Sequence, residues 1–248
     1  MVDLTFLFSD STWNRPQTRM ILQPLSFNQL PLYNKNPCQE VIEETQLRYK
    51  QLKKIDAKFD LVEFVKMAES IFFSVYTALC TLNVKMLEPI MSHGLYLTYE
   101  TRINEYLERK ITPRFDNLVL RDVCVERIEV EKNQIIAIRF FIEAQIYDLD
   151  SRGYLLRGDY STTGWSEDWV FIRSNTVKTN TESVDFSNRC PNCSAPLELV
   201  EGTCMYCNVW VSSGQYDWVL QTIKREGNLL SSWESRGEKA EDLVKELG

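Results

Sequence analysis

The sequence lacks the features that would carry it into or across a membrane. No apolar run approaches the ~20 residues that a membrane-spanning helix needs. The first residues, MVDLTFLFSD, contain no positive charge, and Asp3 and Asp10 stand where targeting peptides avoid acidic side chains. We therefore expect no signal peptide, no transmembrane helix and a cytoplasmic location, with peripheral contact to the inner face of a membrane left open.

Positive charge and histidine are also scarce. Lys and Arg number 28 against 35 Asp and Glu, a net charge of -7 that repels phosphate backbones and disfavours nucleic acid as a partner. The one histidine, His93, stands at an expected helix start, where a surface or capping role is favoured over catalysis. Seven cysteines cannot all pair, and Cys38, Cys80 and Cys124 occur singly, which favours buried thiols in a reducing compartment.

The N-terminal part divides into an arm and a helix. Residues 1–36 contain three prolines and no clear period, so we expect an irregular arm. Residues 37–59 show helical spacing of apolar positions, with acidic residues first and basic residues last. Two interpretations stay open: a basic face that contacts an anionic membrane or an acidic partner, or charges that complement the helix dipole. The basic residues are Arg48, Lys50, Lys53, Lys54 and Lys58.

Residues 60–186 are expected to form one α+β domain that begins with a long helix. Asp60 and Glu63 have the spacing of a capping box, and Phe59 with Phe64 can form the flanking hydrophobic staple. Apolar residues then recur at steps of three or four up to Met86, which predicts a buried helix that ends at Pro89. A second helical pattern covers residues 95–107.

The period then changes from 3.6 to 2, which predicts antiparallel strands over residues 118–130, 135–148 and 165–173. On the second strand one face is apolar, whereas Arg139, Glu143, Gln145 and Tyr147 face the other way. The third strand carries Trp165, Glu167, Trp169 and Phe171 on a single face. Helices followed by a meander give the α+β class, with the sheet curled around the long helix. The apolar face of the second strand consists of Ile136, Ile138, Phe140, Ile142, Ala144 and Ile146.

Four cysteines in residues 187–213 have the spacing of a zinc ribbon. Cys190 and Cys193 form one Cys-x-x-Cys turn, and Cys204 and Cys207 form a second turn after ten intervening residues. Each such turn presents two thiolates to one metal ion, so the pattern predicts one Zn²⁺ per chain. Four protein ligands leave no open coordination position, which makes the predicted site structural. We expect Trp210, Tyr216 and Trp218 to join the ribbon to the main domain. Residues 214–248 are expected to form a helical C-terminal tail.

Several of these segments occur together, and in the same order, in a known family. They are residues 55–64, the strand 167–173, the ribbon 190–207 and the aromatic segment 216–220. Together they resemble prokaryotic relatives of the C-terminal domain of the mitochondrial import-motor scaffold, the forty-four-kilodalton inner-membrane translocase subunit. The resemblance implies a cone-shaped fold like that of nuclear transport factor two, with an apolar pocket. It also implies non-catalytic binding of membrane surfaces, translocation components or ribosomes.

Three functions follow from these observations. The first is a non-catalytic scaffold that binds a protein complex or an anionic membrane surface. The second is a pocket protein that binds a small apolar ligand or catalyses a reaction, with Glu143, Tyr147, Glu167 and Trp169 as pocket candidates. The competing interpretation of the polar candidates is exposed strand residues that pair with Arg139 and Arg173. The third is ribosome or RNA association through the ribbon, which the acidic charge of that module disfavours.

Overall fold

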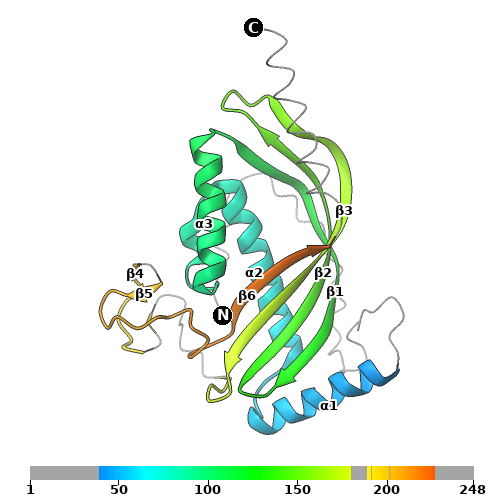
Figure 1. The fold of residues 1–248 in the computed structure, drawn as a ribbon, viewed down its shortest axis with the longest axis vertical. Coiled ribbons are helices and arrows are strands. Elements are labelled where there is room, and N and C mark those ends of the chain that lie inside the picture. The colour runs from blue at the N-terminus through cyan, green and yellow to red at the C-terminus, as the bar shows by residue number, and fades with distance from the viewer. Residues whose placement is uncertain (1–38, 180–188, 191, 201, 227–248) are drawn as a thin grey trace.

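The computed structural model describes residues 39–179, 189–190, 192–200 and 202–226. The helices come first in the chain and the strands follow, so the fold is α+β as expected (Figure 1). The predicted arm, residues 1–36, lies outside the described residues. The helical elements are α1 (Gln39–Ile55), α2 (Leu61–Thr81), the 3-10 turn η3 (Val84–Leu87) and α3 (His93–Glu108). The strands are β1 (Thr112–Val130), β2 (Asn133–Leu149), β3 (Leu155–Ser174), β4 (Leu199–Val200), β5 (Thr203–Cys204) and β6 (Val219–Glu226).

Helix α2 starts where the sequence predicts. The Asp60 carboxylate accepts hydrogen bonds from the backbone N–H groups of Val62 (2.8 Å) and Glu63 (3.1 Å), which satisfies two donors that the first turn leaves free. The rings of Phe59 and Phe64 lie 6.0 Å apart across this start, which confirms the hydrophobic staple. The helix ends earlier than predicted, because Leu82 adopts a left-handed conformation (φ 53°) and η3 follows before Pro89.

Four antiparallel strands form one curved sheet in the order β1-β2-β3-β6. Register shifts interrupt the β1–β2 pairing at three places, and such bulges increase twist and bend a strand. The strands are longer than predicted, most of all β3, whose first half is largely exposed and shows no apolar alternation. In Figure 1, α2 crosses the concave side of this sheet with α3 beside it, and α1 crosses one end of the sheet.

The core fills the space between α2 and the concave face. All six apolar residues predicted for one face of β2 are buried there, including Ile136, Ile138 and Phe140, each at 0% exposure. The ring of Phe72 on α2 lies 5.3 Å from the Phe140 ring and 5.8 Å from the Trp169 ring. Aromatic contacts of this kind bury large apolar areas, so they fix α2 against the sheet.

Strand β6 corrects one expectation. Residues 219–226 belong to the predicted helical tail (214–248), but the structure pairs them with β3, for example Ile223 opposite Trp169. Leu220 is fully buried, and its backbone exchanges hydrogen bonds with Ile90 O (2.9 Å) and Ser92 N (2.9 Å). The strand therefore joins the sheet to the start of α3. Residues 227–248 of the predicted tail lie outside the described part of the chain.

A buried ion pair fastens the end of α1 to the sheet. Arg173 on β3 is 1% exposed and donates from Nη2 to the Asp56 carboxylate (2.7 Å), which also accepts from Thr179 N (2.8 Å) and Oγ1 (2.6 Å). The guanidinium lies 4.6 Å from the centre of the Trp218 ring. The exposed pairing expected for Arg173 with a sheet carboxylate is therefore wrong, because this side chain points into the interior.

Candidate functional site

The four predicted ligand residues come together in the small hairpin formed by β4 and β5. The sulfurs of Cys190 and Cys207 are 3.7 Å apart, and those of Cys193 and Cys204 are 3.8 Å apart. All four sulfurs lie within 4.8 Å of one another. A disulfide would bring two sulfurs to about 2.05 Å, so these are separate thiols arranged around one point. The arrangement is compatible with a metal ion.

Each Cys-x-x-Cys turn is closed by a left-handed residue. Ser194 (φ 59°) donates its N–H to Cys190 O at 2.9 Å, and Asn208 (φ 55°) donates to Cys204 O at 2.8 Å. Asparagine tolerates this conformation, whereas serine adopts it at a cost, as the sequence suggests. The Asn192 N–H also faces the Cys190 sulfur at 3.4 Å. The two turns are thus built alike and present their thiols to a common centre.

The electrostatic environment favours a thiolate at one ligand. The side-chain hydrogen bond from Asn192, followed by the Val209 N–H, lowers the pKa of Cys207 to about 6. In the same cluster, the Ala195 N–H lowers the pKa of Cys193, but burial and the hydrogen bonds with the other three thiols outweigh it and raise that pKa to about 12. A metal ion binds the thiolate form, so metal binding at this cluster would release protons. Cys190 and Cys204 are buried, at 1% and 0% exposure, whereas Cys193 is exposed.

The hairpin docks beside α3, as its position in Figure 1 shows. The Gly202 N–H donates to the carboxylate of Glu88, and the ring of His93 meets the Trp210 ring edge-on at 4.5 Å. The Trp210 indole N–H donates to Ser212 Oγ at 2.9 Å. His93 therefore takes part in packing between the hairpin and the helical layer. A small cavity at this contact is lined by Glu88, His93, Tyr96, Gly202, Trp210 and Ser212.

The basic residues of the first helix serve different purposes. Lys53 donates to the backbone oxygens of Ala57 (2.7 Å) and Phe59 (2.9 Å), so it stabilises the turn between α1 and α2. Arg48 pairs with Glu44 at 3.5 Å. Lys50, Lys54 and Lys58 are exposed.

The pocket candidates separate onto the two faces of the sheet. On the outer face, Glu143 pairs with Arg121 at 2.7 Å, and the Tyr147 hydroxyl donates to Asp116. Burial and this hydrogen bond raise the pKa of Tyr147 to about 12. Arg139, the other expected partner, pairs with Asp168 at 2.6 Å.

On the inner face, Glu167 is 6% exposed and accepts three hydrogen bonds. The donors are the Tyr76 hydroxyl (2.7 Å), Trp165 Nε1 (3.0 Å) and Trp169 Nε1 (2.9 Å). Trp169 is fully buried in the core. No acid–base pair forms among the four candidates, because Glu143 and Tyr147 lie across the sheet from Glu167.

Three residues near Glu167 escaped the sequence analysis. Arg225 lies opposite Glu167 in the β3–β6 register, and Tyr99 and Arg102, both on α3, lie within electrostatic reach of Arg225. Residues 219–223, Val-Leu-Gln-Thr-Ile, are rich in apolar and β-branched side chains, and that composition is the signal that could have identified the strand. The partner strand, however, lies across the ribbon in sequence.

These features define an α+β cone with an appended four-cysteine hairpin. The model of the Tim44-like domain family matches residues 45–183, more than half of the 248 residues. The chain belongs to the Tim44-like domain family. The match ends before the hairpin and before β6.

Curated proteins and solved structures give different results. No curated protein matches the chain. Among solved structures, the intermembrane space region of the chloroplast protein ARC6 matches with 9% identity and a TM-score of 0.36. This match covers 64% of the present chain and 94% of that chain.

Proposed function

We propose that this protein is a non-catalytic scaffold that binds at the inner face of an anionic membrane or to a membrane protein complex. The membership of the Tim44-like domain family carries this proposal, since proteins and membranes are the general partners of that family. Within the described residues, no helix is long and apolar enough to cross a bilayer. Any contact that the described part makes with a membrane would therefore be made by its surface.

Helix α1 offers a suitable surface. Leu47, Lys50 and Lys54 share one helical face by their spacing, and all three are exposed, Leu47 at 55%. An exposed apolar residue flanked by lysines suits an anionic lipid surface, where each lysine contributes about 1 kcal/mol. Lys53 bonds to the turn after α1, and Arg48 pairs with Glu44. We assign the contact chiefly to Lys50 and Lys54, with Lys58 beyond the end of the helix.

Flotation with liposomes tests this assignment. The protein should float with vesicles that contain anionic lipid and stay behind with neutral vesicles. The variant Lys50→Glu/Lys54→Glu should bind at least about thirtyfold more weakly, since two lysine contributions of about 1 kcal/mol each are lost. The control Lys85→Glu/Lys132→Glu changes the net charge equally at two other exposed lysines and should float like the wild type. Equal flotation of both variants, or indifference to lipid charge, contradicts a membrane contact through α1.

We further propose that the cysteine cluster holds one structural Zn²⁺. Zinc–sulfur bonds of about 2.3 Å in a tetrahedron place the sulfurs about 3.8 Å apart. The separations of 3.7 and 3.8 Å agree with that edge. Four thiolates leave no position for water or substrate, so the ion would stabilise the hairpin and have no part in a reaction.

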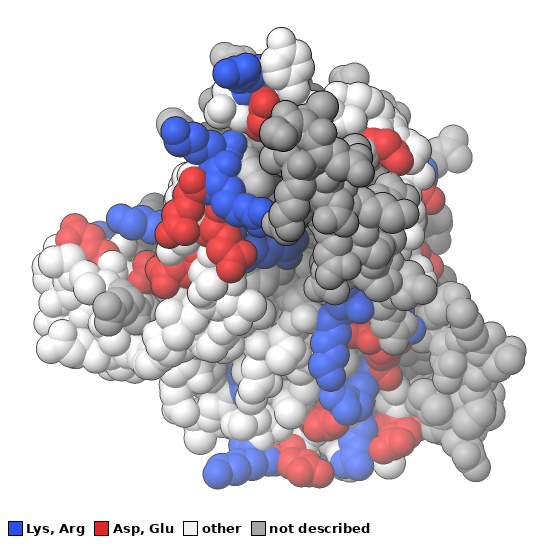
Figure 2. All heavy atoms as spheres, turned by 45° about the horizontal axis from the view of Figure 1, so that its top comes forward, with Lys and Arg blue, Asp and Glu red and all other residues white. Residues whose placement is uncertain are grey.

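The two alternatives have less support. A catalytic pocket needs a general acid and base within reach of one substrate, but Glu143 and Glu167 lie on opposite faces of the sheet. RNA binding needs a basic surface, and on the face in Figure 2 acidic and basic side chains are interspersed. In the described part of the hairpin, Arg189 stands against Glu198.

A further inference from the structure

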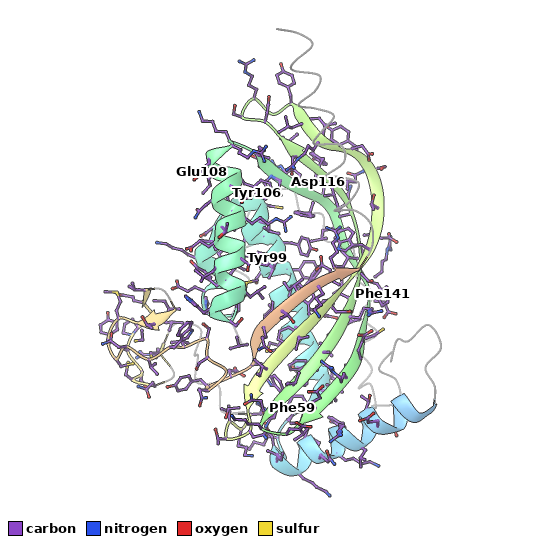
Figure 3. The ribbon with its side chains drawn as sticks, viewed as in Figure 1. Phe59, Tyr99, Tyr106, Glu108, Asp116 and Phe141 are labelled. Carbon is purple, nitrogen blue, oxygen red and sulfur yellow. The ribbon has the colours of Figure 1, made fainter. Side chains whose placement is uncertain are left out.

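A polar cluster lies on the inner side of the cone between α2, α3 and the β3–β6 pair. Glu167 and Arg225 are direct partners across the two strands, so their side chains leave the sheet on the same side. Helix α2 contributes Tyr76, and α3 contributes Tyr99 and Arg102. Figure 3 shows Tyr99 on the side of α3 that faces the sheet. The cluster thus joins residues that are far apart in sequence.

The guanidinium of Arg225 is incompletely satisfied. Its Nε and Nη2 atoms are shielded from solvent and have no hydrogen-bond acceptor, while its face stacks on the Trp165 ring at 4.3 Å. Leaving buried donors of a charged group unpaired is costly. The nearby Glu167 carboxylate does not supply the missing acceptor, because its oxygens accept from Tyr76, Trp165 and Trp169.

The surroundings favour a further negative charge. Arg225 and Arg102 bring two positive charges against the single carboxylate of Glu167. The pKa of Tyr99 is raised, first by burial and then by the Glu167 charge, and both arginines oppose that rise, which places all four groups within electrostatic reach. Arg102 is exposed and lies against the Tyr106 ring (5.9 Å), so the cluster reaches the molecular surface at α3.

We propose that this inner cluster binds the carboxylate or phosphate group of a small ligand, with Arg225 as the principal donor and Arg102 as the second. A planar guanidinium matches either group with two parallel hydrogen bonds, which a lysine cannot offer. Tyr99, within electrostatic reach of both arginines, is the third donor that we assign to the site. Arg225 lies outside residues 45–183, so the site depends on a strand that the family match does not include. It is independent of the basic face of α1.

Titration calorimetry with three probes tests the proposal. Sodium octanoate offers a carboxylate on an apolar chain, inorganic phosphate offers the free anion, and octanol is the uncharged counterpart of octanoate. We expect saturable binding of octanoate or phosphate, and the probe that binds identifies which anion the site prefers. Octanol should bind at least tenfold more weakly than octanoate if the carboxylate is the group recognised. Failure of both anions to bind the wild type overturns the proposal.

The variants separate a ligand-binding role from a purely structural one. Arg225→Gln should weaken anion binding by about tenfold or more, since it removes hydrogen bonds to a charged group. Lys224→Gln removes the same charge from the neighbouring exposed position and should bind like the wild type. Arg102→Gln, on the exposed side of the cluster, gives a second test if Arg225→Gln does not fold. Wild-type affinity in a folded Arg225→Gln variant contradicts the proposal, as does wild-type affinity in Arg102→Gln where Arg225→Gln does not fold.

Discussion

Asp56 occupies a position where one side chain joins three parts of the fold. It directly follows α1, pairs with Arg173 of β3 and accepts two hydrogen bonds from Thr179. Burial works against its ionised form, but the Thr179 bonds and the Arg173 charge outweigh burial and lower the pKa of Asp56. Because this pKa is lower in the folded than in the unfolded chain, the pair stabilises the fold above pH ~4. That contribution is lost as the pH falls through the folded-state pKa.

At the residue scale we therefore predict a large effect of Asp56→Asn. The variant leaves the buried guanidinium of Arg173 without its counter-charge, which should lower the free energy of unfolding by about 3 kcal/mol at pH 7. The difference from wild type should begin to shrink below pH ~4, where the carboxylate of the unfolded chain takes up a proton, and it should shrink further as the pH falls through the lower folded-state pKa. Urea unfolding at pH 7 and pH 3.5 measures both effects.

Asp60→Asn is the matched control for that prediction. It removes a carboxylate four residues away, but Asp60 is exposed and asparagine caps a helix about as well as aspartate. The control should stay within about 0.5 kcal/mol of wild type. Equal losses in the two variants, or a loss at Asp56 that does not change with pH, would contradict the role assigned to the ion pair.

At the scale of elements, β6 is the piece that completes the core. It adds a fourth strand to the sheet, and its first residues bond to the segment that precedes α3. Leu220 lies fully buried in the core cluster together with Met91 and Phe171. A strand with this burial is part of the folded domain, although it follows the hairpin in sequence.

We predict that Leu220→Ala lowers the free energy of unfolding by about 2–5 kcal/mol, as expected for a cavity at a fully buried leucine. Lys224→Ala, on the same strand but exposed, should change it by less than about 0.5 kcal/mol. Chemical denaturation monitored by tryptophan fluorescence measures the difference. Similar small effects of both substitutions would mean that residues 219–226 do not belong to the core.

Local signals made part of this architecture predictable. The start of α2 depends on Asp60 and Phe59, which act within one helical turn, and the apolar alternation of β2 reports directly which residues are buried. The clustering of the four cysteines was also predictable, because two Cys-x-x-Cys turns at this spacing can bring their thiols to a common centre.

The rest depends on contacts between distant segments. The first half of β3 is exposed and contains Gly158 and Gly164, so its sequence shows no buried face. Strand β6 pairs across the hairpin, and nothing in residues 219–226 alone specifies β3 as the partner. The inward direction of Arg173 follows from Asp56, a partner 117 residues away. For the same reason, the Glu167–Arg225 pairing was invisible in the sequence.

At the scale of the whole molecule, a cysteine-bound hairpin sits against a helix-backed cone. The hairpin has only two short strands, β4 and β5, and its contacts with the cone include the Gly202–Glu88 hydrogen bond and the Trp210–His93 ring contact. So small a unit buries too little apolar surface to fold without a cross-link such as a disulfide or a bound metal ion. A metal ion at the four sulfurs would supply that cross-link and hold Gly202 and Trp210 in place against η3 and α3.

The metal content of freshly purified, reduced protein tests most directly whether the four cysteines hold a zinc ion. Elemental analysis should find about one zinc per chain in the wild type, and the same in Cys80→Ala, which removes a cysteine outside the cluster. Cys193→Ser should retain far less, because it removes one of four ligands. Wild-type protein without zinc, or undiminished zinc in Cys193→Ser, would contradict the account.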